Sequence, residues 1–198
     1  MRSFLVASVF VLSWAAAASA DIVTWDCDND GDSAIDCVVT DWSGSSGEYN
    51  MTIVGNQFWG PGHMVGTFDT DTTLDPTLNI RNTVDNDCDF DWTGYTVNIY
   101  LSQPFTISNV QTYGPAGWSG GITQQGSFWN GMEYLGIVDF TGPTPIPQTT
   151  GQIDFGYTIS FSGATRYYFT QEMVPVPEPA TMGLLGLGLA GLLFRRRR

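Results

Sequence analysis

The sequence has no lysine, and its other basic side chains are few and mostly terminal. Its 198 residues include 20 acidic residues and 7 arginines, which gives a formal net charge of −13. Between residues 21 and 174 only Arg81 and Arg166 oppose 19 acidic residues, which leaves a charge of −17. Because phosphate contacts need clustered Lys and Arg, this composition excludes a general nucleic-acid binder. It also argues against docking on anionic lipid.

The sequence has a single histidine, His63, which restricts the enzyme chemistry that the chain could perform. It contains neither an H-E-x-x-H nor a G-x-S-x-G motif. A Ser-His-Asp triad could use only His63, which we expect to be an ordinary strand or loop residue. No pair of glutamates stands out as the two carboxylates of a glycosidase. We therefore expect a non-catalytic protein, with a carboxylate-dependent hydrolase as an alternative.

No stretch between residues 21 and 174 shows a sustained helical period. Short segments rich in β-branched and aromatic residues recur instead, separated by Gly, Pro, Asn and Asp. In the clearest of them, apolar and polar residues alternate as in strands that bury one face. The pattern predicts one all-β domain over residues 21–174, an antiparallel β-sandwich or jelly roll. The predicted strands are 22–25, 35–42, 49–54, 63–68, 78–84, 95–101, 105–111, 134–140, 152–161 and 166–171.

The first 20 residues have the three parts of a secretory signal peptide. Arg2 supplies a positive start, an apolar run covers residues 4–18, and Ala18-Ser19-Ala20 is a small-x-small cleavage site. The chain turns acidic at Asp21, directly after this site. We therefore expect signal peptidase to cleave after Ala20 and the acidic domain to be exported.

The C-terminal end combines a proline-rich motif, an apolar run and a basic terminus. The motif Pro177-Glu178-Pro179 precedes an apolar run over residues 181–194. As a helix this run would be about 21 Å long, against a hydrocarbon core of about 30 Å, so it predicts a short transmembrane helix. The terminal arginines should stop the chain on the cytoplasmic side, which places residues 21–174 outside. These arginines are Arg195, Arg196, Arg197 and Arg198.

In the order and spacing of these three parts, residues 175–198 resemble the PEP-CTERM protein-sorting signal of Gram-negative bacteria. The resemblance implies that an exosortase recognises Pro177-Glu178-Pro179 and cleaves close to it. It also implies transit through the inner membrane, followed by release or transfer to the cell surface, often beside exopolysaccharide and biofilm genes. Residues 90–95 are more loosely similar to β-rich extracellular domains that precede such tails, which implies a fold rather than an activity.

An acidic loop follows the first predicted strand. Its spacing, D-x-D-x-D-G-D, copies the first half of an EF-hand loop, in which alternate carboxylates around a glycine turn wrap calcium. Cys37 stands at the twelfth position, where a bidentate Glu belongs. A looser calcium site is therefore one interpretation, and an Asx turn without metal is the other. The residues of the predicted calcium site are Asp26, Asp28, Asp30, Asp32 and Asp36.

The chain has three cysteines, Cys27, Cys37 and Cys88. Because an exported protein meets an oxidising compartment, we expect one disulfide and one free thiol. Cys27–Cys37 is the most local pair, and closing that loop would contribute roughly 2.5 to 3 kcal/mol in the chain-entropy model. Cys88 is the alternative partner for either of them.

Several tryptophans lie near glycine-rich loops, where an exposed aromatic face could stack on a sugar ring, although tryptophan is also a normal core residue of sandwiches. The address and the acidic fold predict an exported structural or matrix-associated surface protein. The alternative is a calcium-assisted carbohydrate-binding module, whose partner would be polysaccharide. The tryptophans in question are Trp42, Trp59, Trp118 and Trp129.

Overall fold

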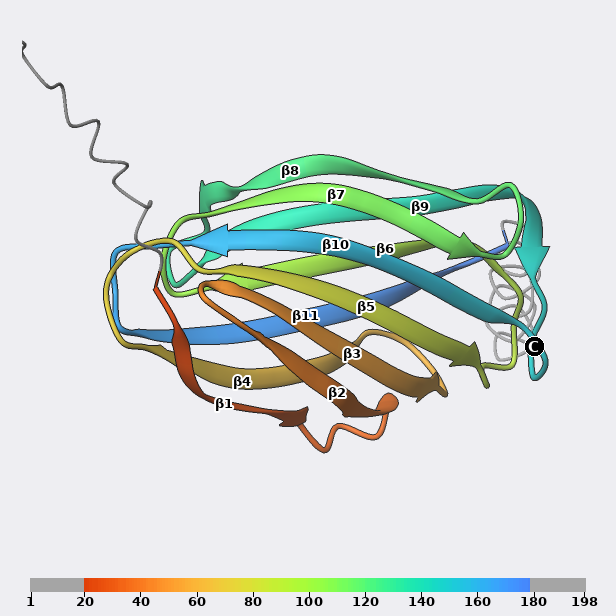
Figure 1. Cartoon of the computed structure of the whole chain (residues 1–198). Helices are drawn as coiled ribbons and strands as arrows, with labels where there is room; N and C mark the ends of the chain where they lie inside the picture. Colours follow the sequence, from red (N-terminus) through yellow and green to blue (C-terminus); the bar gives the residue numbers. More distant parts are fainter. Residues whose placement is uncertain (1–19, 179–198) are drawn as a thin grey trace, which may run out of the picture.

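The protein is an all-β sandwich, which confirms the predicted fold class. The computed structural model describes residues 20–178, and this part of the chain contains strands and no helix. Two sheets lie face to face (Figure 1). The strands are β1 Ile22–Asn29, β2 Ile35–Ser45, β3 Glu48–Gln57, β4 Gly62–Thr70, β5 Thr77–Asn86, β6 Trp92–Leu101, β7 Phe105–Gly114, β8 Ser119–Trp129, β9 Tyr134–Ile146, β10 Gln152–Phe161 and β11 Arg166–Pro177.

The two sheets differ in size, and each is built from strands that are not all consecutive in the chain. One has six strands in the order β1-β4-β11-β6-β9-β8, and the other has five in the order β2-β3-β5-β10-β7. Neighbouring strands are antiparallel except β3 and β5, which run parallel. The edge strand β1 contacts β2, and β7 contacts β8, so the sandwich is closed along both sides.

All ten predicted strands are present, and nine of them are longer than predicted. The additional strand is β8, which forms one edge of the six-stranded sheet. Its residues are mostly exposed and include three glycines, so the strand carries little apolar alternation. Because period-two alternation is the signal for a strand, an exposed edge of this kind gives almost none.

The core fills the space between the sheets with the inward-facing residues of both. Aromatic rings meet there across the two layers, with 4.5 Å between the ring centroids of Phe140 and Phe155. Burying one large apolar side chain contributes about 1.5 to 3 kcal/mol, so this layer dominates the stability of the fold. Fully buried examples from β6 and β10 are Tyr95, Val97, Ile99, Leu101, Ile153, Phe155 and Ile159.

The two ends of the sandwich carry different parts of the chain. The β1–β2, β5–β6 and β9–β10 connections and the end of β11 share one end, where the N–H of Glu178 donates to the backbone oxygen of Asp91. We call this the tail end (Figure 1). The chain enters at the other end, where Asp21 and Asp71 are joined by a backbone hydrogen bond.

Much of the predicted terminal architecture lies outside the described residues. This holds for residues 1–19 of the signal peptide, for Pro179, for the apolar run and for the four terminal arginines. β11 continues through Pro177, so residues 175–177 of the predicted tail form the end of a sheet strand. Among residues 20–178 no helix is long and apolar enough to cross a membrane.

Candidate functional site

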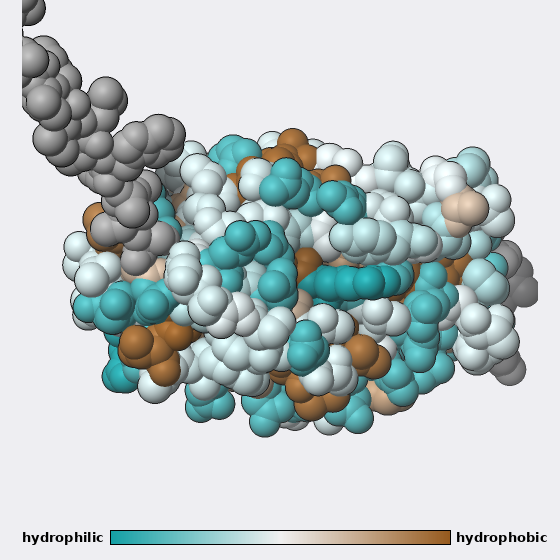
Figure 2. All heavy atoms as spheres, in the orientation of Figure 1, coloured by the Kyte–Doolittle hydropathy of each residue, from teal (hydrophilic) through white to brown (hydrophobic). Residues whose placement is uncertain are grey.

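A polar groove crosses the outer face of the five-stranded sheet. It has a volume of about 380 Å³ and is lined by β3, β5, β10 and β7. Ligand sites commonly have volumes of about 300 to 1,000 Å³. Alternation along each strand turns residues such as Met51, Ile80 and Tyr157 inward and leaves polar neighbours outside. Figure 2 shows this side of the molecule as mainly polar with scattered apolar patches.

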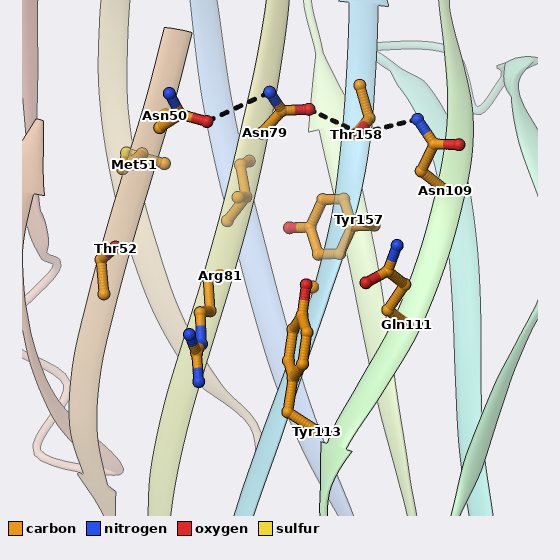
Figure 3. A pocket seen from close by; sticks show the side chains of 12 residues that line it. Asn50, Met51, Thr52, Asn79, Arg81, Asn109, Gln111, Tyr113, Tyr157 and Thr158 are labelled. Carbon is orange, nitrogen blue, oxygen red and sulfur yellow. Dashed lines mark hydrogen bonds between the residues drawn. The ribbon is translucent and has the colours of Figure 1, made fainter. Parts of the chain in front are cut away.

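Asparagine and threonine side chains form a first row across the strands (Figure 3). Asn50, Asn79 and Thr158 stand opposite one another in register. The Thr158 hydroxyl donates to Oδ1 of Asn79 at 2.7 Å, and the Asn79 amide donates to Oδ1 of Asn50 at 3.2 Å. Asn109 of β7 extends the row by donating its amide to Oγ1 of Thr158 at 3.4 Å.

A second row lies beside the first and contains the hollow of the groove. Its members are Thr52, Arg81, Gly156 and Gln111, again in register. Gly156 places no side chain between Arg81 and Gln111, and a Cβ there would lie 2.9 Å from the backbone oxygen of Ile80. The side-chain amide of Gln111 lines the groove and makes no hydrogen bond within residues 20–178. Its donor and its acceptor are both available to a ligand.

An arginine, an aspartate and a tyrosine form one margin of the groove. Arg81 donates through Nε to Oδ1 of Asp154 at 3.0 Å and through Nη2 to Oδ2 at 2.6 Å. The guanidinium carbon lies 4.5 Å from the centre of the Tyr113 ring, a cation–π contact. Tyr113 is nevertheless 54% exposed. Because Asp154 balances Arg81, this margin is close to neutral on a strongly acidic protein.

Two β-bulges in β7 place groove side chains. The pairing with β10 shifts between Gly156 and Thr158, which leaves an extra residue at positions 109–110, and it shifts again opposite Tyr113. Asn109 has a φ of 50°, a left-handed conformation that asparagine adopts more readily than most residues. Bulges bend an edge strand and re-aim its side chains. Here they turn Asn109 and Tyr113 toward the groove.

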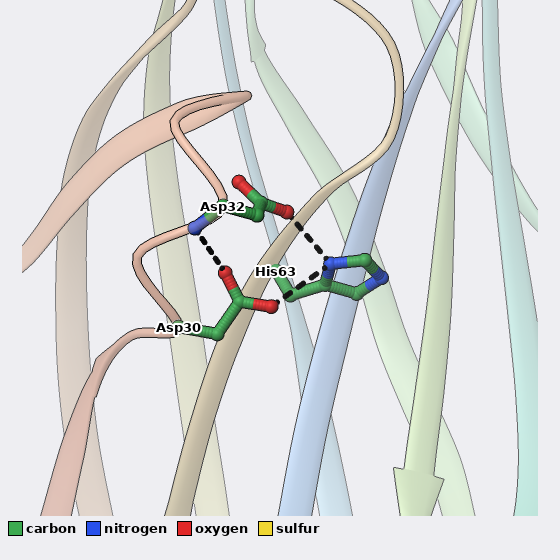
Figure 4. A group of neighbouring side chains, drawn as sticks. All are labelled: Asp30, Asp32 and His63. Atoms are coloured by element: carbon green, nitrogen blue, oxygen red, sulfur yellow. Dashed lines mark hydrogen bonds and ion pairs between the residues drawn. The ribbon is translucent and has the colours of Figure 1, made fainter.

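A second cluster lies at the tail end, where His63 of β4 meets Asp30 and Asp32 (Figure 4) and also a third carboxylate, that of Glu172. Nδ1 of His63 lies 2.9 Å from Oδ2 of Asp32 and 3.2 Å from Oδ2 of Asp30, both in the β1–β2 loop. Nε2 lies 3.4 Å from Oε1 of Glu172 on β11. All hydrogen bonds and ion pairs of the His63 imidazole within the described chain therefore go to carboxylates.

These carboxylates favour the charged form of the imidazole. Partial burial alone would lower the pKa of His63, but the Asp32 hydrogen bond and the charges of Glu172 and Asp30 outweigh burial and raise that pKa. Burial likewise opposes ionisation of Asp32, yet the N–H of Ala34 and His63 together lower its pKa. Asp30, Asp32 and His63 could also hold a metal ion through one atom each. A ligand set with one imidazole suits zinc better than calcium, which prefers oxygen ligands.

The structure divides the residues of the predicted calcium site. Asp30 and Asp32 lie with His63, whereas Asp26, Asp28 and Asp36 are outside that group. The loop itself is a series of Asx turns, because the N–H of Asp32 donates to Oδ1 of Asp30 and the N–H of Ala34 to Oδ1 of Asp32. This is the arrangement expected of the loop without metal. Calcium binding remains a prediction.

The expected Cys27–Cys37 disulfide is absent, and the thiols of Cys27, Cys37 and Cys88 are all free. Cys27 lies on β1 and Cys37 on β2, in different sheets. Each is fitted against a glycine of its own sheet, since a Cβ at Gly66 would lie 2.5 Å from Sγ of Cys27 and one at Gly55 2.9 Å from Cβ of Cys37. The two thiols therefore stay unbonded in the structure although the residues are ten apart in the sequence.

The number of free thiols in the protein can be measured directly. Denaturation of the exported protein without reductant should expose three thiols per chain to Ellman's reagent. A count of one would show that a disulfide forms after all, and a fully reduced aliquot provides the reference. In the native protein reaction should be slow, because burial, and next the charges of nearby aspartates, raise the pKa of Cys27 and of Cys37 to about 12.

Sequence reasoning did not find the groove. The tryptophans considered as sugar platforms lie elsewhere: Trp118 is buried, Trp42 stacks on Trp25 with 4.6 Å between ring centroids, and Trp59 is exposed in the β3–β4 connection. The available signal was the residue type at outward positions. Three predicted strands carry amides there, at Asn50, Asn79 and Asn109, where an acidic protein would be expected to carry carboxylates.

Comparison with known proteins bears on the tail. Residues 175–198 match the family model of the PEP-CTERM protein-sorting motif. No curated protein matches the sequence. The match agrees with the order of Pro-Glu-Pro, apolar run and arginines in the sequence. The chain thus carries a PEP-CTERM sorting motif, the signal of an exported protein that an exosortase processes for the cell surface or the extracellular space.

Proposed function

We propose that this protein is a non-catalytic component of the cell surface or extracellular matrix, and that it binds exopolysaccharide through the groove on its five-stranded sheet. The single observation that carries this proposal is the pair of polar rows around Gly156, which place side-chain amides, among them the unpaired amide of Gln111, on neighbouring strands of one sheet. The sorting motif directs the protein to the cell surface or the extracellular space, where it would meet such a ligand. After signal peptidase and exosortase have acted, the acidic sandwich is the part left to function.

The chemistry of the groove suits a neutral sugar. Sugar hydroxyls both donate and accept hydrogen bonds, and amides such as Gln111 offer both functions within one planar group. The exposed ring of Tyr113 adds an apolar surface beside them. A uronic-acid polymer would meet a balanced Arg81–Asp154 pair and a net charge of −17 over residues 21–174, so we expect it to bind more weakly.

We propose a non-catalytic role for the protein because the groove residues do not include a pair of carboxyl groups that could act together in hydrolysis. Its carboxylate, Asp154, is engaged by Arg81 through two hydrogen bonds. Glycoside hydrolysis needs two carboxyl groups flanking the scissile bond. In the other cluster the imidazole of His63 contacts carboxylates only, and the hydroxyl that joins the cluster is the phenol of Tyr100, which donates to Glu172 at 3.2 Å and does not contact the imidazole.

Truncation of the groove side chains should remove binding and leave the fold unchanged. We expect Tyr113→Ala and Gln111→Ala each to weaken binding of the bacterium's purified exopolysaccharide about tenfold, the loss expected for one well-placed contact of about 1.4 kcal/mol. Binding would be measured by calorimetry and on an array of neutral and uronic-acid oligosaccharides. Calcium and EDTA should make no difference, because the groove and the Asp30–Asp32 loop are built by different residues.

The opposite sheet offers matched controls. Tyr168 is 57% exposed there, and Arg166 forms a similar two-bonded pair with Asp69. Tyr168→Ala and Arg166→Ala should bind like the unmodified protein. Equal binding by the Tyr113 and Tyr168 variants would refute the groove as the site. Binding that is lost in EDTA would favour the calcium-assisted alternative instead.

A further inference from the structure

We propose that the folded protein holds its own sorting motif on the sheet, and that residues 174–178 must leave β6 before an exosortase can process the chain. The inference rests on the exosortase processing that the motif implies. It concerns the form of the substrate that the enzyme meets.

Pro177, the first residue of the motif, and the residues just before it belong to β11 of the six-stranded sheet. Val174 pairs with Thr96, Val176 with Gly94, and Pro177 with Trp92. Beyond the strand, the N–H of Glu178 donates to the backbone oxygen of Asp91 at 3.3 Å. The Thr93 hydroxyl also lies 3.4 Å from the backbone oxygen of Val176 and 3.3 Å from that of Pro177. Pro177 and Glu178 are therefore bonded to β6 and to the residue that precedes it.

The same segment is held on one side only. β4 pairs with β11 as far as Met173 and then ends, so residues 174–177 have β6 as their single partner. Residues two apart in a strand direct their N–H groups to the same side. The N–H of Glu178 points toward Asp91, on the β6 side of the strand. The backbone nitrogens of Pro175 and Pro177 therefore face the opposite side, where no strand pairs with this segment. Prolines are tolerated there and cannot bond a further strand. The segment can thus open locally without disturbing β4.

The short distance to the apolar run makes this opening necessary. The run begins at Thr181, three residues after Glu178. Three extended residues reach at most about 10 Å, and the interfacial layer of a bilayer is about 5 to 7 Å deep on each side. With the motif on the sheet and the run in the membrane, the tail end of the sandwich would stand against the bilayer surface. Release of residues 174–178 adds about 17 Å of reach, which gives an enzyme room to surround the motif.

A disulfide staple tests the proposal directly. A Cβ at Gly94 would lie 3.4 Å from Cβ of Val176, close to the separation of about 3.5 to 4.5 Å in disulfides. The double variant Gly94→Cys with Val176→Cys would be expressed at full length in cells that carry the exosortase, and processing would be followed by pulse–chase and mass spectrometry. We expect the oxidised variant to keep its tail and added dithiothreitol to restore processing. Each single variant should be processed at the rate of the unmodified chain.

Loosening the segment should have the opposite effect. Thr93→Val keeps the β-branched shape but removes the hydroxyl that reaches Val176 and Pro177, and we expect processing about fivefold faster, as for one net hydrogen bond. Thr96→Val is the matched control on the same strand, because the Thr96 hydroxyl donates to Asp139 of β9 at 2.6 Å. It should leave the rate unchanged.

The outcomes separate this inference from the sorting function itself. Equal processing of the stapled variant with and without dithiothreitol would overturn the requirement for release. An unmodified chain that keeps its tail as fully as a Pro177-Glu178-Pro179 to alanine variant would overturn exosortase processing instead. Faster processing of Thr93→Val but not of Thr96→Val supports release from β6 specifically.

Discussion

Replacing Gln57 with alanine should destabilise the folded protein by about 3 to 5 kcal/mol, the largest effect that we expect of any single polar substitution. Gln57 is fully buried at the end of β3. Its Nε2 donates to the backbone oxygens of Gly60 at 2.6 Å and Trp59 at 3.3 Å, and its Oε1 accepts from the Tyr95 hydroxyl at 2.9 Å. Alanine would leave the fully buried Tyr95 hydroxyl without a partner and would remove the donor of two part-buried carbonyl groups; an unpaired buried group costs about 1 to 3 kcal/mol.

The measurement is urea unfolding of the purified exported protein, read as the shift in midpoint at constant slope. Gln124→Ala is the control, since its Nε2 makes one hydrogen bond, to the backbone oxygen of Leu135 at 3.0 Å, in a partly exposed position. We expect that variant to lose about 1 kcal/mol or less. If both variants unfolded at the same urea concentration, Gln57 would not join the two sheets at the tail end as its contacts indicate.

The position of Gln57 also connects stability with sorting. Nε2 lies 3.5 Å from the backbone oxygen of Met173, the last residue of β11 that is paired on both sides. Residues 174–178 begin immediately after it. Gln57 thus secures β11 up to the point at which we propose that opening begins. A chain that lacks this contact should release more of β11, so Gln57→Ala should also be processed faster.

Most strands of the two sheets could be predicted from the sequence because burial of one face makes apolar residues alternate with polar ones along a strand. Tyr95, Val97, Ile99 and Leu101 alternate with polar residues, and all four lie in the core. Strands with one buried face are therefore readable from pattern alone. β8 has few buried residues, and its place depends on pairing with β9, which no local pattern encodes.

The site was less predictable because its parts meet only through the topology of the sheet. Asn50, Asn79, Thr158 and Asn109 come from four strands, and the contact between Asn109 and Thr158 depends on a bulge in β7. A bulge is a shift of register between two strands, so neither strand reveals it separately. The His63 cluster could not be predicted either, because its residues also come together only through the topology of the sheet. Its carboxylates come from the β1–β2 loop and from β11, more than 100 residues apart.

The His63 cluster should make stability depend on pH with a sign that identifies its chemistry. The pKa of His63 is raised in the folded protein by Asp32, Glu172 and Asp30 against the effect of partial burial. Its contribution is therefore complete below the ordinary histidine pKa of about 6.5 and is lost as the pH rises through the folded value. Asp32 has a lowered pKa, so its contribution is present above about pH 4 and is lost as the pH falls further.

The difference in unfolding free energy between the unmodified protein and His63→Gln isolates this cluster, because the general repulsion among acidic groups is common to both chains. We expect the unmodified protein to be more stable by about 1 kcal/mol between pH 4.5 and 6, the upper end for pairs exposed to solvent, and the difference to shrink toward pH 8. A bound metal would produce the opposite trend, since it needs a neutral imidazole and binds more tightly as the pH rises. A difference that grows toward pH 8 and disappears in EDTA would therefore replace the ion pair with a metal site at Asp30, Asp32 and His63.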